Sequence, residues 1–181
     1  KVAHVSIDDA TVLFHDIYAH EYDSIFDNLV FGKLQSLHEK YGVIVTLYVF
    51  EDYYGFHLWE MPIDYKQEFK ENADWLKIGF HSATTDNPAE SGESVEDFIM
   101  AYEWTMSAIW KFAGGESIAN VLRLHYWYAT DEMVEYLTKQ GVEGLLCSDS
   151  MGESYDLTTE QMDELYGSCN GLLEEEMTYY V

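Results

Sequence analysis

The sequence predicts an α/β fold built around a parallel sheet. Apolar segments of strand length alternate five times with segments of helical periodicity, as in chains of repeated strand–helix units. Among these segments, residues 43–50 form a nearly continuous apolar run, which is typical of parallel strands covered on both faces. Each run ends in polar residues, and active sites of parallel α/β folds lie at the carboxyl ends of the strands. The expected strands are residues 2–7, 43–50, 76–80, 121–126 and 142–147, with 177–181 as a candidate sixth.

The segments between these strands carry helix signals. Residues 14–41 show one apolar face at helical spacing and are followed by Gly42, where a left-handed cap is common. Residues 51–61 form an aromatic-rich loop, and Pro62 suits the first turn of a short helix that runs to about residue 74. Three further helices are predicted from capping residues: one after Ser94 with Asp97, one over 131–140 after Thr130, and one after Thr158 with Gln161.

Length and charge limit the domain count and the partners. The 181 residues, 48% of them hydrophobic, suffice for one domain with a sizeable core, so we expect a single domain over 1–181. The formal net charge of -25 repels phosphate backbones, which makes nucleic acid and anionic membranes poor partners. The simplest explanation of this acidic excess is solubility alone. No apolar run reaches the roughly 18 residues of a membrane span.

Several motif classes are missing from the sequence. It has no GxGxxG, no GxxxxGK[ST] and no GxSxG, which disfavours nucleotide binding and serine hydrolase chemistry. Its two cysteines, Cys147 and Cys169, form no CxxC pair, so we expect a reducing, cytoplasmic compartment. The chain begins with Lys1 rather than methionine, which leaves a processed leader open.

Asp8 and Asp9 close the first expected strand and form the centre of the candidate site. Two carboxylates at the end of a buried strand are costly unless a cation or base chemistry uses them. One could hold a divalent metal while the other takes a proton from water. The structural alternative is that one aspartate caps the following segment and the other is solvated.

His81 and His125 are the histidines that follow strands in a position to join Asp9. A neutral imidazole is a common ligand for zinc, although an isolated histidine is more often a core or loop residue. A catalytic zinc site needs three protein ligands and one open position. With Asp9 and His81 as two of them, His125 is the first candidate for the third, and Asp86 is the next.

Arg123 is the single arginine of the chain and lies two residues before His125. If both lie in a strand, they share one face of it. An arginine at the mouth of the site needs a carboxylate partner, and Asp8 and Asp149 are the candidates. Arg123 would then orient Asp8 as a base and lower its pKa, or it would form a buried ion pair that fixes the fold.

Three of these segments resemble the motifs of the polysaccharide deacetylase family of carbohydrate esterases. Residues 6–9 (Ser-Ile-Asp-Asp) resemble its Thr-Phe-Asp-Asp motif, and residues 81–82 (His-Ser) resemble the start of its His-Ser/Thr-x-x-His motif. Residues 123–126 (Arg-Leu-His-Tyr) resemble its Arg-x-Pro-Tyr motif. Each motif is weak alone, but their order agrees over roughly residues 2–149, most of the chain.

The resemblance implies a distorted (β/α) barrel of about seven strands, which this chain would leave incomplete at its C-terminus. It also implies a divalent metal, with zinc expected, that serves to remove N- or O-acetyl groups from sugars. Asp8 would be the general base, Asp9 and His81 metal ligands, and Arg123 the residue that orients the base.

This sequence departs from the family pattern at four points. Ala10 replaces the glycine after the two aspartates, Thr85 stands at the second histidine of the metal motif, and His125 replaces the proline. No histidine follows His125, so the late general acid of the family has no counterpart. A divergent member is therefore expected, with a metal site rebuilt from His125 or Asp86, or with altered activity.

The first functional hypothesis is a metal-dependent hydrolase that removes acetyl groups from a carbohydrate or a related small-molecule amide. The alternative is a catalytically silent sugar-binding or interaction domain on the same scaffold, motivated by Thr85 and the missing late histidine. A third option is a lyase or isomerase that uses Asp8 as a base without a metal.

Overall fold

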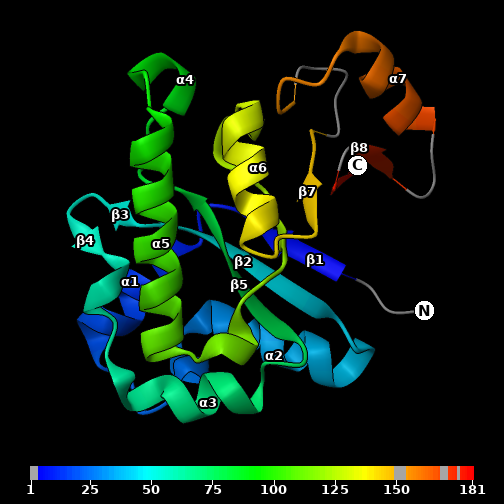
Figure 1. Ribbon diagram of the computed structural model, residues 1–181. Helices are drawn as coiled ribbons and strands as arrows, with labels where there is room; N and C mark the ends of the chain where they lie inside the picture. Colours follow the sequence, from blue (N-terminus) through cyan, green and yellow to red (C-terminus); the bar gives the residue numbers. More distant parts are fainter. Residues whose placement is uncertain (1–3, 149–153, 168–170, 175) are drawn as a thin grey trace.

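The computed structural model of the protein describes residues 4–148, 154–167, 171–174 and 176–181. It is a mixed α/β structure with two small sheets flanked by helices (Figure 1). The first sheet has the order β1 (His4–Ile7), β2 (Ile44–Phe50) and β5 (Leu76–Ser82), and all its strands are parallel. The second has the order β6 (Val121–Leu122), β7 (Gly144–Leu146), β9 (Met177–Tyr180) and β8 (Leu172–Glu174).

The second sheet is mixed, because β8 runs antiparallel to β9 while the β6–β7 and β7–β9 pairs are parallel. One parallel bridge, Ile78 to Ile118, links β5 to the segment before β6. A two-stranded hairpin, β3 (Asp52–Tyr53) and β4 (Phe56–His57), belongs to neither sheet by strand pairing, but it is joined to the end of the first sheet because the Asp52 amide donates to the Ala83 carbonyl.

The expected (β/α) barrel is wrong, because no closed barrel is found in the described part of the chain. The strand predicted over 121–126 ends after Leu122, and the left-handed backbone of Tyr126 and Trp127 cannot continue it. At the β1 edge of the first sheet, β1 pairs only with β2 among the described strands, and its residue Val5 is 39% exposed. The first strand is thus an edge strand and not the buried strand that the sequence predicted.

The helix predicted over 14–41 is two helices, α1 (Thr11–His20) and α2 (Leu29–Tyr41). Glu21 adopts a left-handed conformation that ends α1, and the Asn28 side chain accepts hydrogen bonds from the first amides of α2. Between them lies a short 3-10 helix, η1 (Ile25–Asp27). The predicted stop at Gly42 is confirmed by its φ of 67°.

The capped helices are found where the sequence predicts them. Ser94 caps α5 (Val95–Phe112), and Thr130 caps α6 (Asp131–Lys139). The Thr158 hydroxyl accepts a hydrogen bond from the Gln161 amide at the start of α7 (Thr159–Gly167). The remaining short elements are η2 (Leu58–Glu60), η3 (Ile63–Tyr65), α3 (Lys66–Glu71), α4 (Pro88–Ser91), η4 (Gly115–Ser117) and η5 (His125–Trp127).

The long helix α5 packs against both parts of the core. Its Ile109 and Phe112 join a cluster with the aromatic side chains of α1, α2 and α3, under the first sheet. Its Phe98 and Tyr102 join a second cluster that extends to α6 and the second sheet. This packing fixes the carboxyl ends of β1, β2 and β5 beside the segment after β6. Within the described chain, no helix is long and apolar enough to cross a membrane.

Candidate metal centre

Three residues that are far apart in the sequence lie together and could hold a metal ion: Asp9, His81 and His125. They lie at the carboxyl ends of β1 and β5 and just after β6. The His81 Nε2 atom is 3.4 Å from Asp9 Oδ1 and 3.2 Å from His125 Nδ1. The third separation, from His125 Nδ1 to Asp9 Oδ1, is 3.9 Å. The sequence proposed these three residues as ligands, and the structure brings them together.

The three separations fit a tetrahedral metal site. Ligands about 2.0–2.1 Å from a tetrahedral zinc ion are about 3.4 Å from each other. Two of the separations lie within about 0.2 Å of that value, and the longest exceeds it by about half an ångström. Asp9, whose side chain is exposed, can close this difference by a small rotation.

The turn after β1 places both aspartates at the same cleft. Asp9 has a φ of 53°, and the next amide, that of Ala10, donates to the Tyr48 carbonyl at 2.8 Å. In an extended strand, neighbouring side chains point to opposite faces, and the left-handed turn ends that alternation. Asp8 and Asp9 consequently line one cleft.

His81 is held by a backbone hydrogen bond that leaves one ring nitrogen for the cluster. The side chain is 4% exposed, and its Nδ1 lies 2.5 Å from the Arg123 carbonyl oxygen. A carbonyl only accepts, so Nδ1 carries the hydrogen and Nε2 presents its lone pair to Asp9 and His125. Burial lowers the pKa of His81, which favours this neutral form.

His125 is oriented in the same way by a different carbonyl. Its Nε2 lies 3.2 Å from the Thr85 carbonyl oxygen, so Nε2 donates and Nδ1 presents a lone pair. Two lone pairs that face each other at 3.2 Å repel unless a cation lies between them or one nitrogen is protonated. Thr85, a poor ligand by its side chain, thus orients a ligand through its backbone.

The route by which Arg123 and His125 reach the site differs from the prediction. They do not share the face of a strand, because β6 ends at Leu122 and His125 begins the short helix η5. The predicted contact of Arg123 with Asp8 is confirmed, since Nη1 lies 3.3 Å from Oδ2. The other candidate partner, Asp149, lies outside the described residues.

Three buried polar atoms at the cleft have no hydrogen-bond partner within the described protein: Asp8 Oδ1, Arg123 Nε and Trp127 Nε1. The cleft has a volume of about 220 Å³ and is lined by both aspartates, His81 and residues 123–127. One acceptor and two donors therefore have no partner among the described residues, and an unpaired buried polar atom costs free energy.

Trp127 lines the cleft but was not among the site residues predicted from the sequence. Trp127 and Tyr126 have φ values of 50° and 55°, a left-handed backbone that is uncommon for aromatic residues. Asp9 shares this backbone state, so three left-handed residues line the cleft. No sequence pattern in this segment signals that conformation, because glycine and asparagine, which favour it, are absent from it.

Asp86, the second candidate for the third ligand, does not belong to the described metal-ligand group. Its side chain is exposed, and its backbone amide donates to the Thr84 hydroxyl at 3.2 Å. Between the two candidates, the geometry therefore favours His125.

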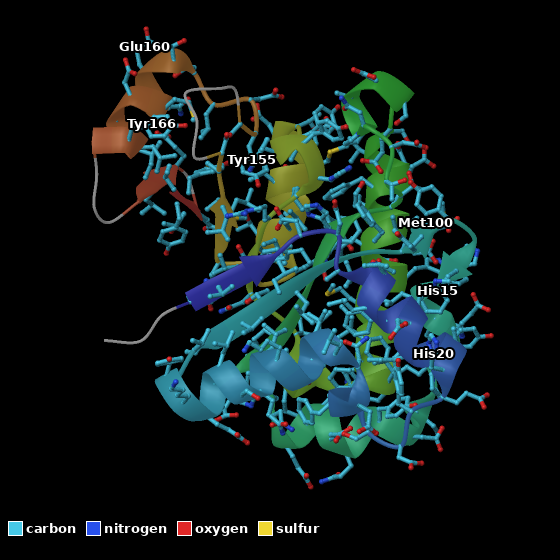
Figure 2. All side chains as sticks on the ribbon, turned by 180° about the vertical axis from the view of Figure 1, so that it is seen from behind. His15, His20, Met100, Tyr155, Glu160 and Tyr166 are labelled. Carbon is cyan, nitrogen blue, oxygen red and sulfur yellow. The ribbon has the colours of Figure 1, made fainter. Side chains whose placement is uncertain are left out.

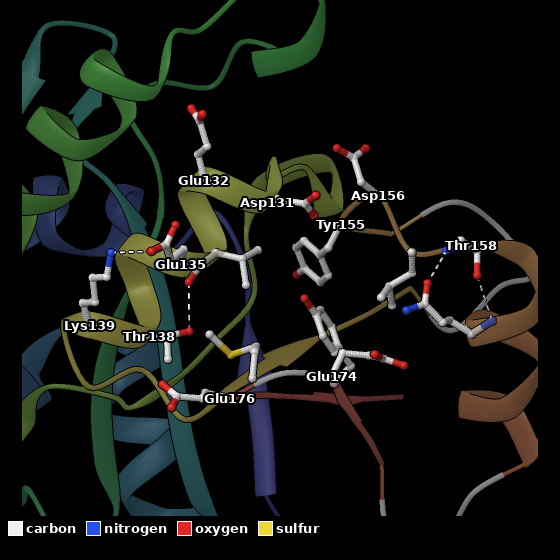
Figure 3. Close-up of a pocket in the computed structure, with 15 residues that line it drawn as sticks. Asp131, Glu132, Glu135, Thr138, Lys139, Tyr155, Asp156, Thr158, Glu174 and Glu176 are labelled. Atoms are coloured by element: carbon white, nitrogen blue, oxygen red, sulfur yellow. Dashed lines mark hydrogen bonds and ion pairs between the residues drawn. The ribbon is translucent and has the colours of Figure 1, made fainter.

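A larger hollow of about 800 Å³ lies between α6 and the chain that follows β7 (Figure 3). One of its carboxylates, Glu135, pairs with Lys139. No metal-ligand group was found there among the residues that the structure describes. Its acidic lining is Asp131, Glu132, Glu135, Asp156, Glu174 and Glu176.

Comparisons of the chain with protein-family models, with curated proteins and with solved structures found no match. Function is therefore inferred from the geometry of the site.

Proposed function

We propose that the protein is a metal-dependent hydrolase that removes acetyl groups from a carbohydrate or a related amide, with zinc as the metal. The observation that carries the proposal is the convergence of Asp9 Oδ1, His81 Nε2 and His125 Nδ1 at tetrahedral spacing. Two imidazoles and one carboxylate form a ligand set common at catalytic zinc, with a fourth position open to water or substrate. The likeness of three motifs to the polysaccharide deacetylase family supports the same reaction.

Asp9, His81 and His125 would hold a divalent ion, which would supply a Lewis acid for the acyl oxygen and lower the pKa of water. Asp8 would then act as the general base, because it lines the cleft beside Asp9 and His81, and its Oδ1 has no hydrogen-bond partner among the described residues. Arg123 contacts the other oxygen, Oδ2, at 3.3 Å and keeps the carboxylate oriented. One oxygen of Asp8, Oδ2, therefore contacts Arg123, and the other, Oδ1, is left for the reaction.

The test combines metal analysis with an acetate-release assay. Protein purified without chelator is analysed for zinc and is then assayed on oligomers of N-acetylglucosamine and on an acetyl ester. Asp8→Asn should keep the zinc and lose at least about a hundredfold in turnover, because the base is gone while the ligands remain. Asp9→Asn should lose both metal and turnover.

The matched control is Asp86→Asn, which removes a nearby exposed carboxylate and should leave metal content and turnover unchanged. Wild-type protein that holds no zinc above the level of Asp9→Asn would refute the metal site. Zinc binding without acetate release from either substrate would refute the hydrolase and favour the second candidate.

That second candidate is a catalytically silent sugar-binding domain. The sequence favours it in one respect, since no histidine follows His125 to act as a general acid for the leaving group. Its signature would be sugar binding and zinc binding with no acetate release.

A further inference from the structure

The long helix α5 buries one side in the core and leaves the opposite side exposed. Its exposed residues recur at spacings of three and four, the pattern by which one helix packs along another. Figure 1 shows α5 at the front of the molecule with no described helix or strand drawn in front of it, and Figure 2 labels Met100, one of its exposed residues. We call this exposed side, together with the neighbouring Trp59, the α5 face. Its residues on the helix are Glu96, Asp97, Met100, Glu103, Trp104, Ser107, Trp110 and the half-buried Lys111.

Three indoles form the apolar centre of the α5 face. Trp59, Trp104 and Trp110 are 45%, 57% and 62% exposed. Trp59 joins the other two, because it lines one hollow of about 620 Å³ with Trp104 and another of about 600 Å³ with Trp110. Exposed tryptophans grouped in this way indicate an interaction surface. At about half exposure the three side chains offer roughly 300 Å² per copy, a large share of the roughly 800 Å² that each partner buries in an ordinary interface.

Two lysines hold two of these indoles in place. The Lys66 Nζ atom lies 4.5 Å from the centre of the Trp110 ring and donates to the Trp110 carbonyl at 3.0 Å. The Lys111 Nζ atom lies 4.8 Å from the centre of the Trp59 ring and donates to the Trp59 carbonyl at 2.6 Å. Cation–π contacts of this kind restrain the rings, and restrained aromatic side chains lose little conformational entropy when a partner binds.

Opposite charges occupy the two ends of the α5 face. The amino-terminal end carries the exposed carboxylates of Glu96 and Asp97. The carboxyl-terminal end carries Lys66 and Lys111, although the whole chain has only nine lysine and arginine residues. When two copies of such a helix pack antiparallel about a two-fold axis, the acidic end of each helix faces the basic end of the other. The α5 face is therefore complementary to itself in charge.

Other occupants match only part of this surface. An acidic segment that suits the lysines would meet Glu96 and Asp97 at the other end, and a basic segment would meet the lysines. The chain has a formal net charge of -25, so elsewhere on the surface two copies repel each other. Glu103, the acid between the two ends, does not break the pattern, because it accepts a hydrogen bond from Tyr136 of α6 at 3.0 Å.

We propose that the α5 face binds a second copy of this chain, with the two α5 helices antiparallel about a two-fold axis and the indoles at the centre of the contact. This homodimer goes beyond the proposed function and does not depend on the metal centre, so either can be wrong without the other.

The first test is sedimentation velocity of the full chain in about 0.15 M salt, where long-range repulsion between the acidic copies is screened. Wild type should be largely dimeric at roughly 100 µM and dissociate on dilution. Trp104→Glu places a charge at the centre of the contact and should weaken dimerisation by about a hundredfold. The matched control is Leu29→Glu, which adds the same charge at an 87% exposed apolar position on α2 and should dimerise as wild type does.

The second test examines the antiparallel arrangement with two charge reversals. Glu96→Lys and Lys66→Glu should each weaken dimerisation by about tenfold, because the two-fold axis makes each like-charge contact twice. An equimolar mixture of the two variants should recover wild-type affinity, since opposite charges then meet at both ends of the heterodimer. Circular dichroism spectra equal to that of wild type show that each variant is folded.

Three results would overturn the proposal. Wild type could be monomeric at roughly 100 µM, or Trp104→Glu could dimerise as tightly as wild type. The mixture of charge-reversed variants could also stay as weakly associated as each variant alone, which would exclude the antiparallel pairing. A monomeric wild type that binds an acidic peptide rich in apolar residues, in a manner that requires Trp104, would make the α5 face a site for a different partner.

Discussion

Replacing Asp9 by asparagine is the most direct test of the metal centre. Asparagine has nearly the same size as aspartate and tolerates the left-handed φ of 53° at this position, so the fold should be unaffected. It removes the only carboxylate of the described metal-ligand group and leaves a neutral amide. Without metal, Asp9→Asn and wild type should therefore unfold at similar temperatures.

The size of the metal effect follows from binding linkage. Free zinc at a hundredfold excess over its dissociation constant stabilises the folded state by about 2.7 kcal/mol. For a chain of this length that corresponds to a rise in melting temperature of about 5–10 °C. If the loss of Asp9 weakens binding about a hundredfold, the same zinc concentration contributes only about 0.4 kcal/mol, or about 1–2 °C.

The assay is thermal unfolding followed by circular dichroism, with EDTA and with zinc, for wild type, Asp9→Asn and Asp86→Asn. We expect a large zinc shift for wild type and Asp86→Asn and a small one for Asp9→Asn. A wild-type protein that melts at one temperature in both buffers would refute the ligand geometry. A shift lost in Asp86→Asn but kept in Asp9→Asn would identify Asp86 as the ligand and refute the assignment made here.

Three further predictions concern the surroundings of the site. Trp127→Phe removes a buried N–H that has no partner among the described residues, so chemical denaturation should find the variant as stable as wild type or up to about 1 kcal/mol more stable. Burial raises the pKa of Cys147 to about 12, so in a Cys169→Ser background this thiol should react with a disulfide reagent at pH 8 only after denaturation. Gly79→Ala places a methyl group about 3.0 Å from the Tyr48 ring, and urea unfolding should show a loss of about 1–3 kcal/mol; an unchanged midpoint would contradict the close approach of β5 to Tyr48.

The helices and the central strands were predictable because local patterns specify them. The apolar run of β2, the caps at Ser94 and Thr130, and the stop at Gly42 each leave a signature within a few residues. The break between α1 and α2 had a signature too, in the capping residue Asn28, but the helical spacing of apolar residues across the break concealed it.

Closure of the sheet could not be predicted in the same way, because it depends on which distant segments pair. The apolar run after Val121 suggests a strand, yet the chain turns at Tyr126 into a left-handed backbone that side-chain type does not announce. The open edge at β1 is a consequence of pairing that no local segment encodes. The resemblance to a barrel family therefore suggested more strand pairing than the described residues make.

The site was more predictable than the sheet, because carboxyl ends of parallel strands converge whether or not the sheet closes. Asp9 and His81 follow from this rule alone. His125 was proposed by the same strand-end reasoning, because a third ligand was needed, and the separate expectation that it shares a strand face with Arg123 was wrong. The carbonyl of Thr85, which orients His125, could not be identified from the sequence, since backbone acceptors leave no residue-type signal.

The free-energy costs at the cleft support a function there independently of any motif. Four described side chains hold a buried polar atom with no hydrogen-bond partner, and those of Asp8, Arg123 and Trp127 all lie at this one cleft. Each costs about 1–3 kcal/mol. Left-handed backbone at Tyr126 and Trp127 adds about 1–2 kcal/mol per residue. A ligand that pairs with the free atoms recovers much of this free energy, so the cleft should be the part of the molecule whose stability responds most to a bound metal or substrate.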